Sequence, residues 1–176
     1  MKSETRKFIN ELADSIRDAF SIDVPIINMR KVVTIIGGEI EEGDPFDFDE
    51  LYDGTIKKNK EDSFLIKISP LQSKERENFT IAHEIGHLFL HMGYIILPEI
   101  WEKQDDIEFT RFGNNEQEYQ AHEFAAAFLM PKEEYKRILD ENTKDNRADI
   151  KSVAKYFNVS MAAATNRGKF LGYIKW

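Results

Sequence analysis

The segment His83-Glu84-Ile85-Gly86-His87 limits what this chain can fold into more than any other feature of its sequence. Two histidines four positions apart lie on one face of a helix, with their β-carbons roughly 5–6 Å apart, so both imidazoles can bind a single zinc ion. The glutamate after the first histidine can reach a metal-bound water and take its proton during attack on a carbonyl. The segment therefore predicts a helix with a catalytic zinc site, in which His83 and His87 are ligands and Glu84 is the general base.

The helix around this segment, expected from about residue 73 to residue 91, has one narrow polar stripe. On a helical wheel at about 100° per residue, its polar side chains share one arc of roughly 100°, and the other positions from 81 to 90 are apolar or glycine. The residues in the arc are Thr80, His83, Glu84, His87 and His91. A surface helix would instead mix lysine and glutamate over a broad face. The pattern favours a buried metal-binding helix over two histidines that share a half-buried face by chance.

The third ligand must be a histidine or a carboxylate, because the chain contains no cysteine and a catalytic zinc usually has three protein ligands plus water. The helix expected from about 115 to 130 places Glu118 and His122 on one face with the apolar Ala125, whereas Glu116 lies away from that face. A carboxylate among apolar neighbours needs a compensating partner, so Glu118 is the favoured ligand. His122 could orient a ligand or be the third ligand itself. Without zinc, Glu118 would simply interact with the positive end of its helix.

Three further side chains near these helices could take part in a reaction. His91 follows His87 by one turn and could hold a ligand or stabilise an oxyanion, unless it is a buried histidine bonded to the backbone. Tyr94 and Tyr119 could each donate a hydrogen bond to a tetrahedral intermediate. The alternating segment 63–69 predicts a half-buried strand, and a substrate could pair with it as an added strand if it lies at a sheet edge.

The remaining segments predict an α+β fold, with a small mixed or antiparallel sheet packed on helices and a helical C-terminal extension. Pro25 opens a short candidate helix that ends at Gly37 and Gly38, and the β-branched run at 32–36 could instead form a strand. Helices are expected at 3–20, 149–157 and 160–170, strands at 39–42, 55–58 and 63–69, and a loop at 43–53. We therefore expect one domain over 1–135, which includes the N-terminal helix 3–20, and a helical subdomain over 136–176.

Composition and charge narrow the class of partner. Apolar residues make up 41% and charged residues 32% of the 176-residue chain, which is the composition of a soluble globular protein. The formal net charge of -8 would repel the phosphates of nucleic acid, so we expect a protein partner and no direct nucleic-acid binding. The sequence shows neither a secretory signal nor an apolar run long enough to cross a bilayer, and the absence of cysteine fits a reducing compartment. These features predict a cytoplasmic protein that does not bind membranes.

Residues 149–173 superficially have the pattern of a helix-turn-helix, so DNA binding is a rival interpretation. The second helix of this segment has Arg167 and Lys169 as its late basic residues, and the whole chain is acidic. We therefore favour a helical cap on the rest of the protein, or a docking surface for a partner, over DNA recognition.

Two stretches, His83–His91 (HEIGHLFLH) and Glu118–Pro131 (EYQAHEFAAAFLMP), together resemble the ImmA/IrrE family of metallopeptidases. The resemblance covers roughly residues 25–135 and implies a zincin-like minimal protease fold, in which two core helices carry the ligands beside a small sheet. It implies one zinc ion on His83, His87 and Glu118, with Glu84 catalytic. One departure is His122, because the family more often has Asn or Asp at this position.

The same resemblance implies a biological role. Members of the family are typically bacterial or phage-derived, and they cut a helix-turn-helix transcriptional repressor to release the genes that it silences. The expectation for this chain is therefore a zinc-dependent endopeptidase with a protein substrate of that kind. The alternative is a non-proteolytic module that contains zinc and regulates a repressor by docking to it.

Overall fold

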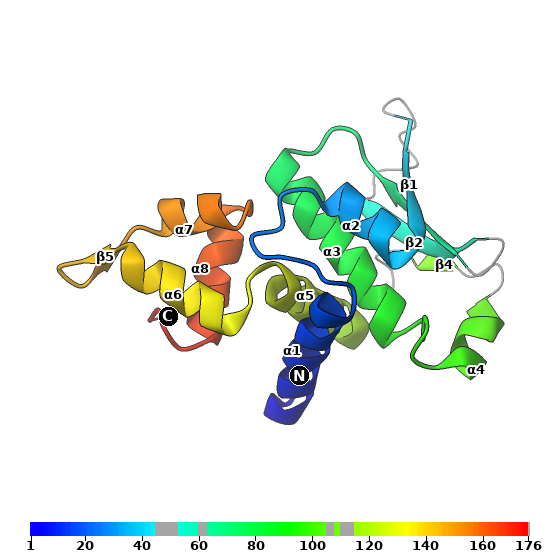
Figure 1. Ribbon diagram of the computed structural model, residues 1–176, viewed down its shortest axis with the longest axis horizontal. Helices are drawn as coiled ribbons and strands as arrows, with labels where there is room; N and C mark the ends of the chain where they lie inside the picture. Colours follow the sequence, from blue (N-terminus) through cyan, green and yellow to red (C-terminus); the bar gives the residue numbers. More distant parts are fainter. Residues whose placement is uncertain (45–52, 60–62, 105–107, 110–114, 176) are drawn as a thin grey trace.

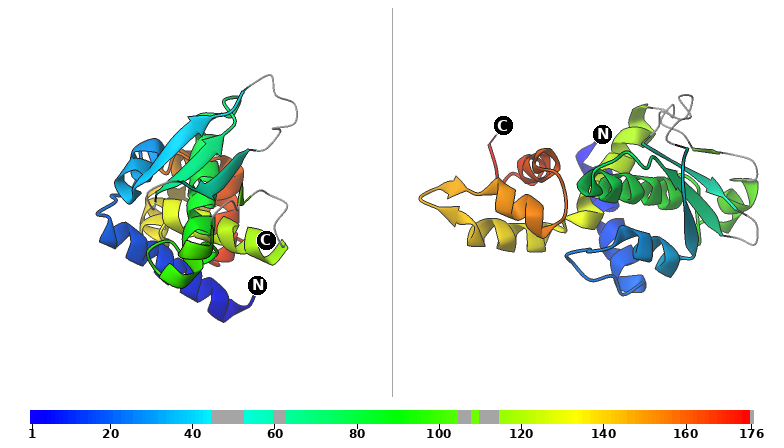
Figure 2. Two further views of the ribbon diagram at one scale, coloured as in Figure 1. Left: turned by 90° about the vertical axis from the view of Figure 1, so that its right-hand side faces the viewer. Right: turned by 90° about the horizontal axis from the view of Figure 1, so that it is seen from above.

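The computed structural model describes residues 1–44, 53–59, 63–104, 108–109 and 115–175 (Figures 1 and 2). Its architecture is α+β, as the sequence predicts. In chain order the elements are α1 (Ser3–Ala19), α2 (Met29–Ile36), β1 (Gly38–Glu42), β2 (Gly54–Lys58), β3 (Phe64–Ile68), α3 (Lys74–Leu90), α4 (Pro98–Trp101), the 3-10 helix η2 (Glu102–Gln104), β4 (Glu108–Phe109), α5 (Asn115–Leu129), α6 (Lys132–Glu141), β5 (Thr143–Lys144), β6 (Arg147–Ala148), α7 (Ile150–Tyr156) and α8 (Met161–Phe170).

Four strands form a mixed sheet in the order β1-β3-β2-β4. Strand β3 is parallel to β1 and antiparallel to β2, and β2 is antiparallel to β4. The alternation in β3 buries Phe64, Ile66 and Ile68 on one face, as its period of two predicts. Because β3 has a partner on both sides, it does not lie at a sheet edge, and the condition under which segment 63–69 could accept a substrate as an added strand is not met.

Helices α3 and α5 lie side by side at the centre of the molecule, between the sheet and the C-terminal helices (Figure 1). Their close approach depends on Gly86, because a β-carbon at this position would lie 3.1 Å from the Cα atom of Ala121. A glycine opposite an alanine lets two helix backbones approach in a way that larger side chains would prevent. This contact sets the distance between the two helices that carry the predicted ligands.

The C-terminal helices α6, α7 and α8, together with the β5–β6 hairpin, gather at the end of the molecule opposite the sheet (Figures 1 and 2). The buried Tyr135 helps hold this region together: its hydroxyl donates to the carbonyl of Ala164 at 2.6 Å, and its ring stacks on Phe157. Helices α7 and α8 begin and end within one residue of the predicted bounds. The division of the chain after residue 135 stays a prediction.

A buried charge network connects the C-terminal helices to α1 and α5. Arg167 of α8 is 2% exposed, and it donates to Glu123 of α5 at 3.2 Å, to the carbonyl of Met130 at 3.0 Å and to Asn10 of α1 at 2.8 Å. Burial lowers the pKa of Arg167 to about 10, although the charge of Glu123 opposes this shift. Arg167 therefore remains charged at neutral pH, and its buried charge is compensated by the partners that join the three helices.

The structure also differs from the sequence-based expectation in several short elements. The segment after Pro25 forms the helix α2, which begins after the capping side chain of Asn28, and the β-branched run in this segment is therefore not a strand. Helix α4, η2 and the β5–β6 hairpin had no clear sequence signal. Most of the loop predicted at 43–53 lies outside the described residues.

Among the described residues, no helix combines the length and the apolar character that a membrane span requires.

Candidate metal centre

Helix α3 carries the histidines and the glutamate of the predicted motif in its buried half. His83, Glu84 and His87 are 1%, 2% and 3% exposed, and their apolar neighbours on the helix lie in the core. The helix begins where the side chain of Ser73 accepts a hydrogen bond from the backbone N–H of Arg76. Polar groups at this depth require compensating partners, so the surroundings of these three side chains decide what the site can do.

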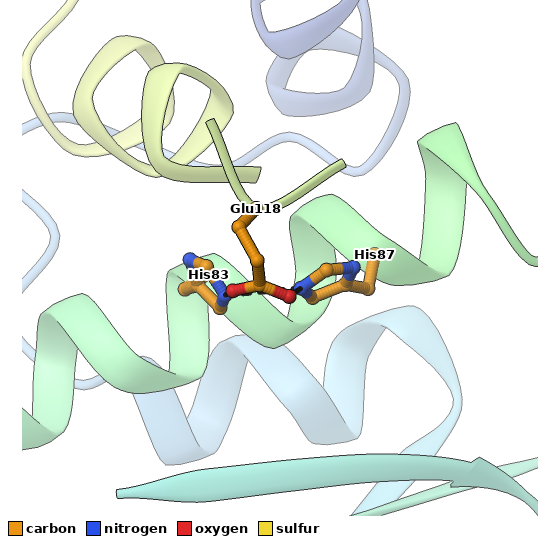
Figure 3. Close-up of side chains that lie close together, drawn as sticks. All are labelled: His83, His87 and Glu118. Carbon is orange, nitrogen blue, oxygen red and sulfur yellow. Dashed lines mark hydrogen bonds and ion pairs between the residues drawn. The ribbon is translucent and has the colours of Figure 1, made fainter. Parts of the chain in front are cut away.

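The structure brings His83, His87 and Glu118 together, as Figure 3 shows. The Nε2 atoms of the two histidines lie 3.0 Å apart. The carboxylate of Glu118 reaches across from α5, with Oε2 at 3.2 Å from Nε2 of His83 and Oε1 at 3.3 Å from Nε2 of His87. The atoms that could bind a metal all lie within 4.8 Å of one another.

The chemistry of these three side chains fits a divalent cation. Two Nε2 atoms and a carboxylate converge on one point, and Oε1 of Glu118 is buried without a hydrogen-bond partner among the described residues. Two imidazoles and one carboxylate form a donor set that zinc prefers, and within the described parts of the chain no fourth side chain joins them. The arrangement therefore matches a catalytic rather than a closed structural site.

The charge states of these groups suit metal binding. Burial, reinforced by the neighbouring His83, lowers the pKa of His87 to about 3, although the charge of Glu118 opposes the shift. The hydrogen bond from His83 lowers the pKa of Glu118 below its usual value. At neutral pH His87 is therefore uncharged and Glu118 is ionised, and these are the protonation states in which imidazole and carboxylate bind metals.

Strand β2 packs directly against the part of α3 that carries Glu84. A β-carbon at Gly54 would lie 2.5 Å from Cγ2 of Thr80 and 3.3 Å from Oε1 of Glu84. The contact with Thr80 is too short for a side chain at this position, so glycine lets the strand backbone pass close to α3 and to the carboxylate of Glu84. The sequence-based interpretation did not identify Gly54, because its partner is distant along the chain and no local pattern marks the contact.

His91 and Gln120 form a hydrogen-bonded chain behind His87. The Nδ1 atoms of His87 and His91 are 2.9 Å apart, and Nε2 of His91 is 3.1 Å from Oε1 of Gln120. Burial lowers the pKa of His91, so its ring is neutral and has one N–H group. The amide oxygen of Gln120 can only accept, so that proton is on Nε2 of His91, and Nδ1 of His91 accepts from His87. The Nε2 atom of His87 then keeps its lone pair for the metal centre.

The other predicted site residues lie at different distances from this centre. The exposed His122 places its ring 4.5 Å from the ring of His83, but it does not join the three converging side chains. Tyr119 is 64% exposed, and Glu116 is exposed as the wheel predicts. The hydroxyl of Tyr94 donates to the carbonyl of Ile36 at 3.0 Å and is buried, so the expectation that Tyr94 could assist a reaction is wrong.

Comparisons with known proteins agree with this picture. The sequence model of peptidase family M78, described as the IrrE N-terminal-like domain, matches residues 33–169, which extends the predicted resemblance into the C-terminal helices. A transcriptional regulator of Mycobacterium tuberculosis is similar in structure, with a TM-score of 0.60 and 16% sequence identity over 93% of this chain and 50% of the regulator. This chain thus spans about half the length of that regulator, and at this identity the likeness concerns the fold alone. The search of curated proteins gave no match.

Proposed function

Because this chain belongs to the ImmA/IrrE family, peptidase family M78, we propose that it is a zinc-dependent endopeptidase with His83, His87 and Glu118 as the metal ligands. The observation that carries this proposal is the convergence of the two imidazoles and the carboxylate within 4.8 Å. The donor set favours zinc over harder cations, which prefer oxygen ligands. Family membership supports a metallopeptidase-like activity, and the three side chains supply a place for the metal.

The proposed reaction is hydrolysis of a peptide bond. When bound, zinc supplies a Lewis acid that polarises the scissile carbonyl and lowers the pKa of an attacking water. Glu84 takes the proton from that water and later passes it to the leaving amine. The backbone of β2 at Gly54 limits the space around the Glu84 carboxylate, which favours a defined orientation of this base.

For the substrate, we propose a transcriptional repressor of the helix-turn-helix type, whose cleavage would release its target genes. The support is the family resemblance of the two ligand-bearing stretches, together with the acidic charge of the chain, which disfavours nucleic acid as the direct partner. A protein substrate is also compatible with an open fourth position at the metal centre.

The first test combines metal analysis with a cleavage assay. Purified protein is expected to hold about one zinc per chain and to cut one member of a panel of purified helix-turn-helix repressors, with the fragments identified by mass spectrometry. A strong chelator is expected to stop cleavage, and added zinc to restore it. Protein that holds no zinc and takes up none when supplied would contradict the proposal.

The hydrogen-bonded chain behind His87 leads to a separate prediction about metal affinity. The His91→Leu variant is expected to bind zinc about 10- to 100-fold more weakly, because His87 loses the acceptor that holds its N–H and its ring orientation. The His91→Asn variant is expected to stay close to wild type, since its side-chain oxygen can accept the same hydrogen bond. Zinc affinity is measured by competition with a coloured chelator, and the melting temperature of the metal-free proteins checks that each variant folds. If the His91→Leu variant binds zinc as tightly as wild type, His91 does not support the metal centre.

A further inference from the structure

A cavity of about 360 Å³ lies beside the candidate metal centre, where α1, α3, α5 and α8 meet. Its walls are largely side chains with apolar surface, and it is separate from the three converging ligands. The wall residues that matter here are Phe79, Tyr119, His122, Ala126, Ala163 and Phe170. The sequence predicts no role for Phe79, Ala126, Ala163 or Phe170. The possible roles of Tyr119 and His122 do not explain why a space of this size lies next to a metal site.

The cavity and the metal centre are neighbours on either side of His122. The ring of His122 lies 4.5 Å from the ring of His83 and 5.8 Å from the ring of Phe79, and both His122 and Phe79 line the cavity. Consecutive Cα atoms of a peptide are about 3.8 Å apart. The residue next to a scissile bond at the metal centre is therefore close enough for its side chain to reach the cavity.

The rim of the cavity exposes large apolar surfaces to solvent. Tyr119 is 64% exposed and Phe170 is 46% exposed, although most large apolar side chains of the described residues lie in the core. The guanidinium of Arg6 lies 4.7 Å above the ring of Phe170 and so helps to fix this part of the rim. Exposed apolar surface around a concave space is typical of a binding site rather than of an inert surface.

The charged residues in the lining are already occupied by bonds within the protein. Glu123 accepts hydrogen bonds from Arg6 at 3.1 Å, from Asn10 at 2.8 Å and from Arg167 at 3.2 Å. The other nitrogens of Arg167 donate to Met130 and Asn10. Because this network satisfies its own charges, the cavity offers a ligand mainly apolar contacts, and an apolar side chain fits it better than a charged one.

We propose that this cavity receives a large apolar side chain, aromatic or long aliphatic, from the residue next to the scissile bond of the protein substrate. The inference rests on the proposed peptidase function, since it needs a substrate at the metal centre. An apolar cavity of about 150 Å³ already holds a benzene ring, so 360 Å³ is ample for the largest apolar side chains. One wall of the cavity comes from α1 and another from α8, so the N-terminal helix and the last helix both take part in selecting the substrate.

The test compares two small hydroxamates that share one metal-binding group: acetyl hydroxamate, which has no side chain, and phenylpropionyl hydroxamate, which adds an aromatic one. Binding to the zinc-loaded full chain is measured by calorimetry, so no turnover is needed. The phenyl compound is expected to bind about 10- to 100-fold more tightly, because its ring is buried in the cavity. In the Ala163→Phe variant, which fills the cavity from α8, this ratio is expected to fall below about 3-fold.

The matched control is Ala162→Phe, because Ala162 is the exposed neighbour of Ala163 on α8 and does not line the cavity. It should keep the wild-type ratio, and both variants should keep their zinc and the wild-type affinity for acetyl hydroxamate. Ala163→Leu serves as a smaller filling if the phenylalanine variant fails to fold. A wild-type ratio below about 3-fold, or an unchanged ratio in both Ala163 variants, overturns the cavity proposal alone. If wild-type protein supplied with zinc binds neither compound, the metal centre is refuted and the cavity proposal fails with it.

Discussion

The Glu84→Gln variant is expected to keep its zinc and to cut the repressor identified in the panel about 10²- to 10⁴-fold more slowly than wild type. Glutamine has nearly the same shape as glutamate, so the 2% exposed side chain can be replaced without a new cavity. Its amide cannot take a proton from water, so the general base is lost while the ligands remain. The measurement is kcat/KM for repressor cleavage, together with the zinc content of the purified variant.

A matched control for this variant is Glu75→Gln, which makes the same chemical change at an exposed position in the first turn of α3. It is expected to cut at the wild-type rate. Equal rates for Glu84→Gln and wild type would show that another group is the base. If Glu84→Gln still relieves repression of a reporter gene without cutting the repressor, the protein acts as a zinc-containing docking module, which is the alternative that the sequence left open.

The Glu118→Ala variant is expected to lose its zinc, with at least about 100-fold weaker binding, because a removed ligand costs more than a lost supporting hydrogen bond. Its carboxylate is the group that joins α5 to both histidines, at 3.2 Å and 3.3 Å from their Nε2 atoms. The readout is metal content by elemental analysis after dialysis, followed by titration with zinc against a chelator.

The control for the metal experiment is Glu116→Ala, on the same helix and in the same first turn but exposed to solvent. This variant should retain about one zinc per chain. His83→Ala should behave like Glu118→Ala, since both remove a ligand. Retention of zinc in Glu118→Ala would exclude Glu118 as the third ligand, and a parallel loss in His122→Ala would then assign that place to His122.

Much of the candidate site could be predicted from local sequence because it depends on helix geometry. The spacing of His83 and His87 by four residues puts both imidazoles on one face of any helix that contains them. The wheel for α5 likewise placed Glu118 on the buried face and Glu116 toward solvent, and the structure agrees. The alternation in β3 was also readable, because strand periodicity is local.

Features that depend on contacts between distant segments could not be predicted in this way. Local sequence did not indicate that Gly54 would pass beside Glu84, or that Gln120 would continue the hydrogen bonds of His91. Local sequence also did not indicate that Glu123 would pair with the buried Arg167 of α8. The role of Tyr94 was misjudged for the same reason, because its hydroxyl is bonded to the carbonyl of Ile36 in the distant helix α2.

The amino-acid sequence by itself determined the ligand-bearing face of α3, because the helical period alone places His83 and His87 together. Only the tertiary structure decided that the carboxylate of Glu118 meets those imidazoles, because this meeting requires α5 to pack closely on α3 where Gly86 faces Ala121. It also decided that a 360 Å³ cavity opens beside the centre, since that space exists only where four helices from both ends of the chain converge.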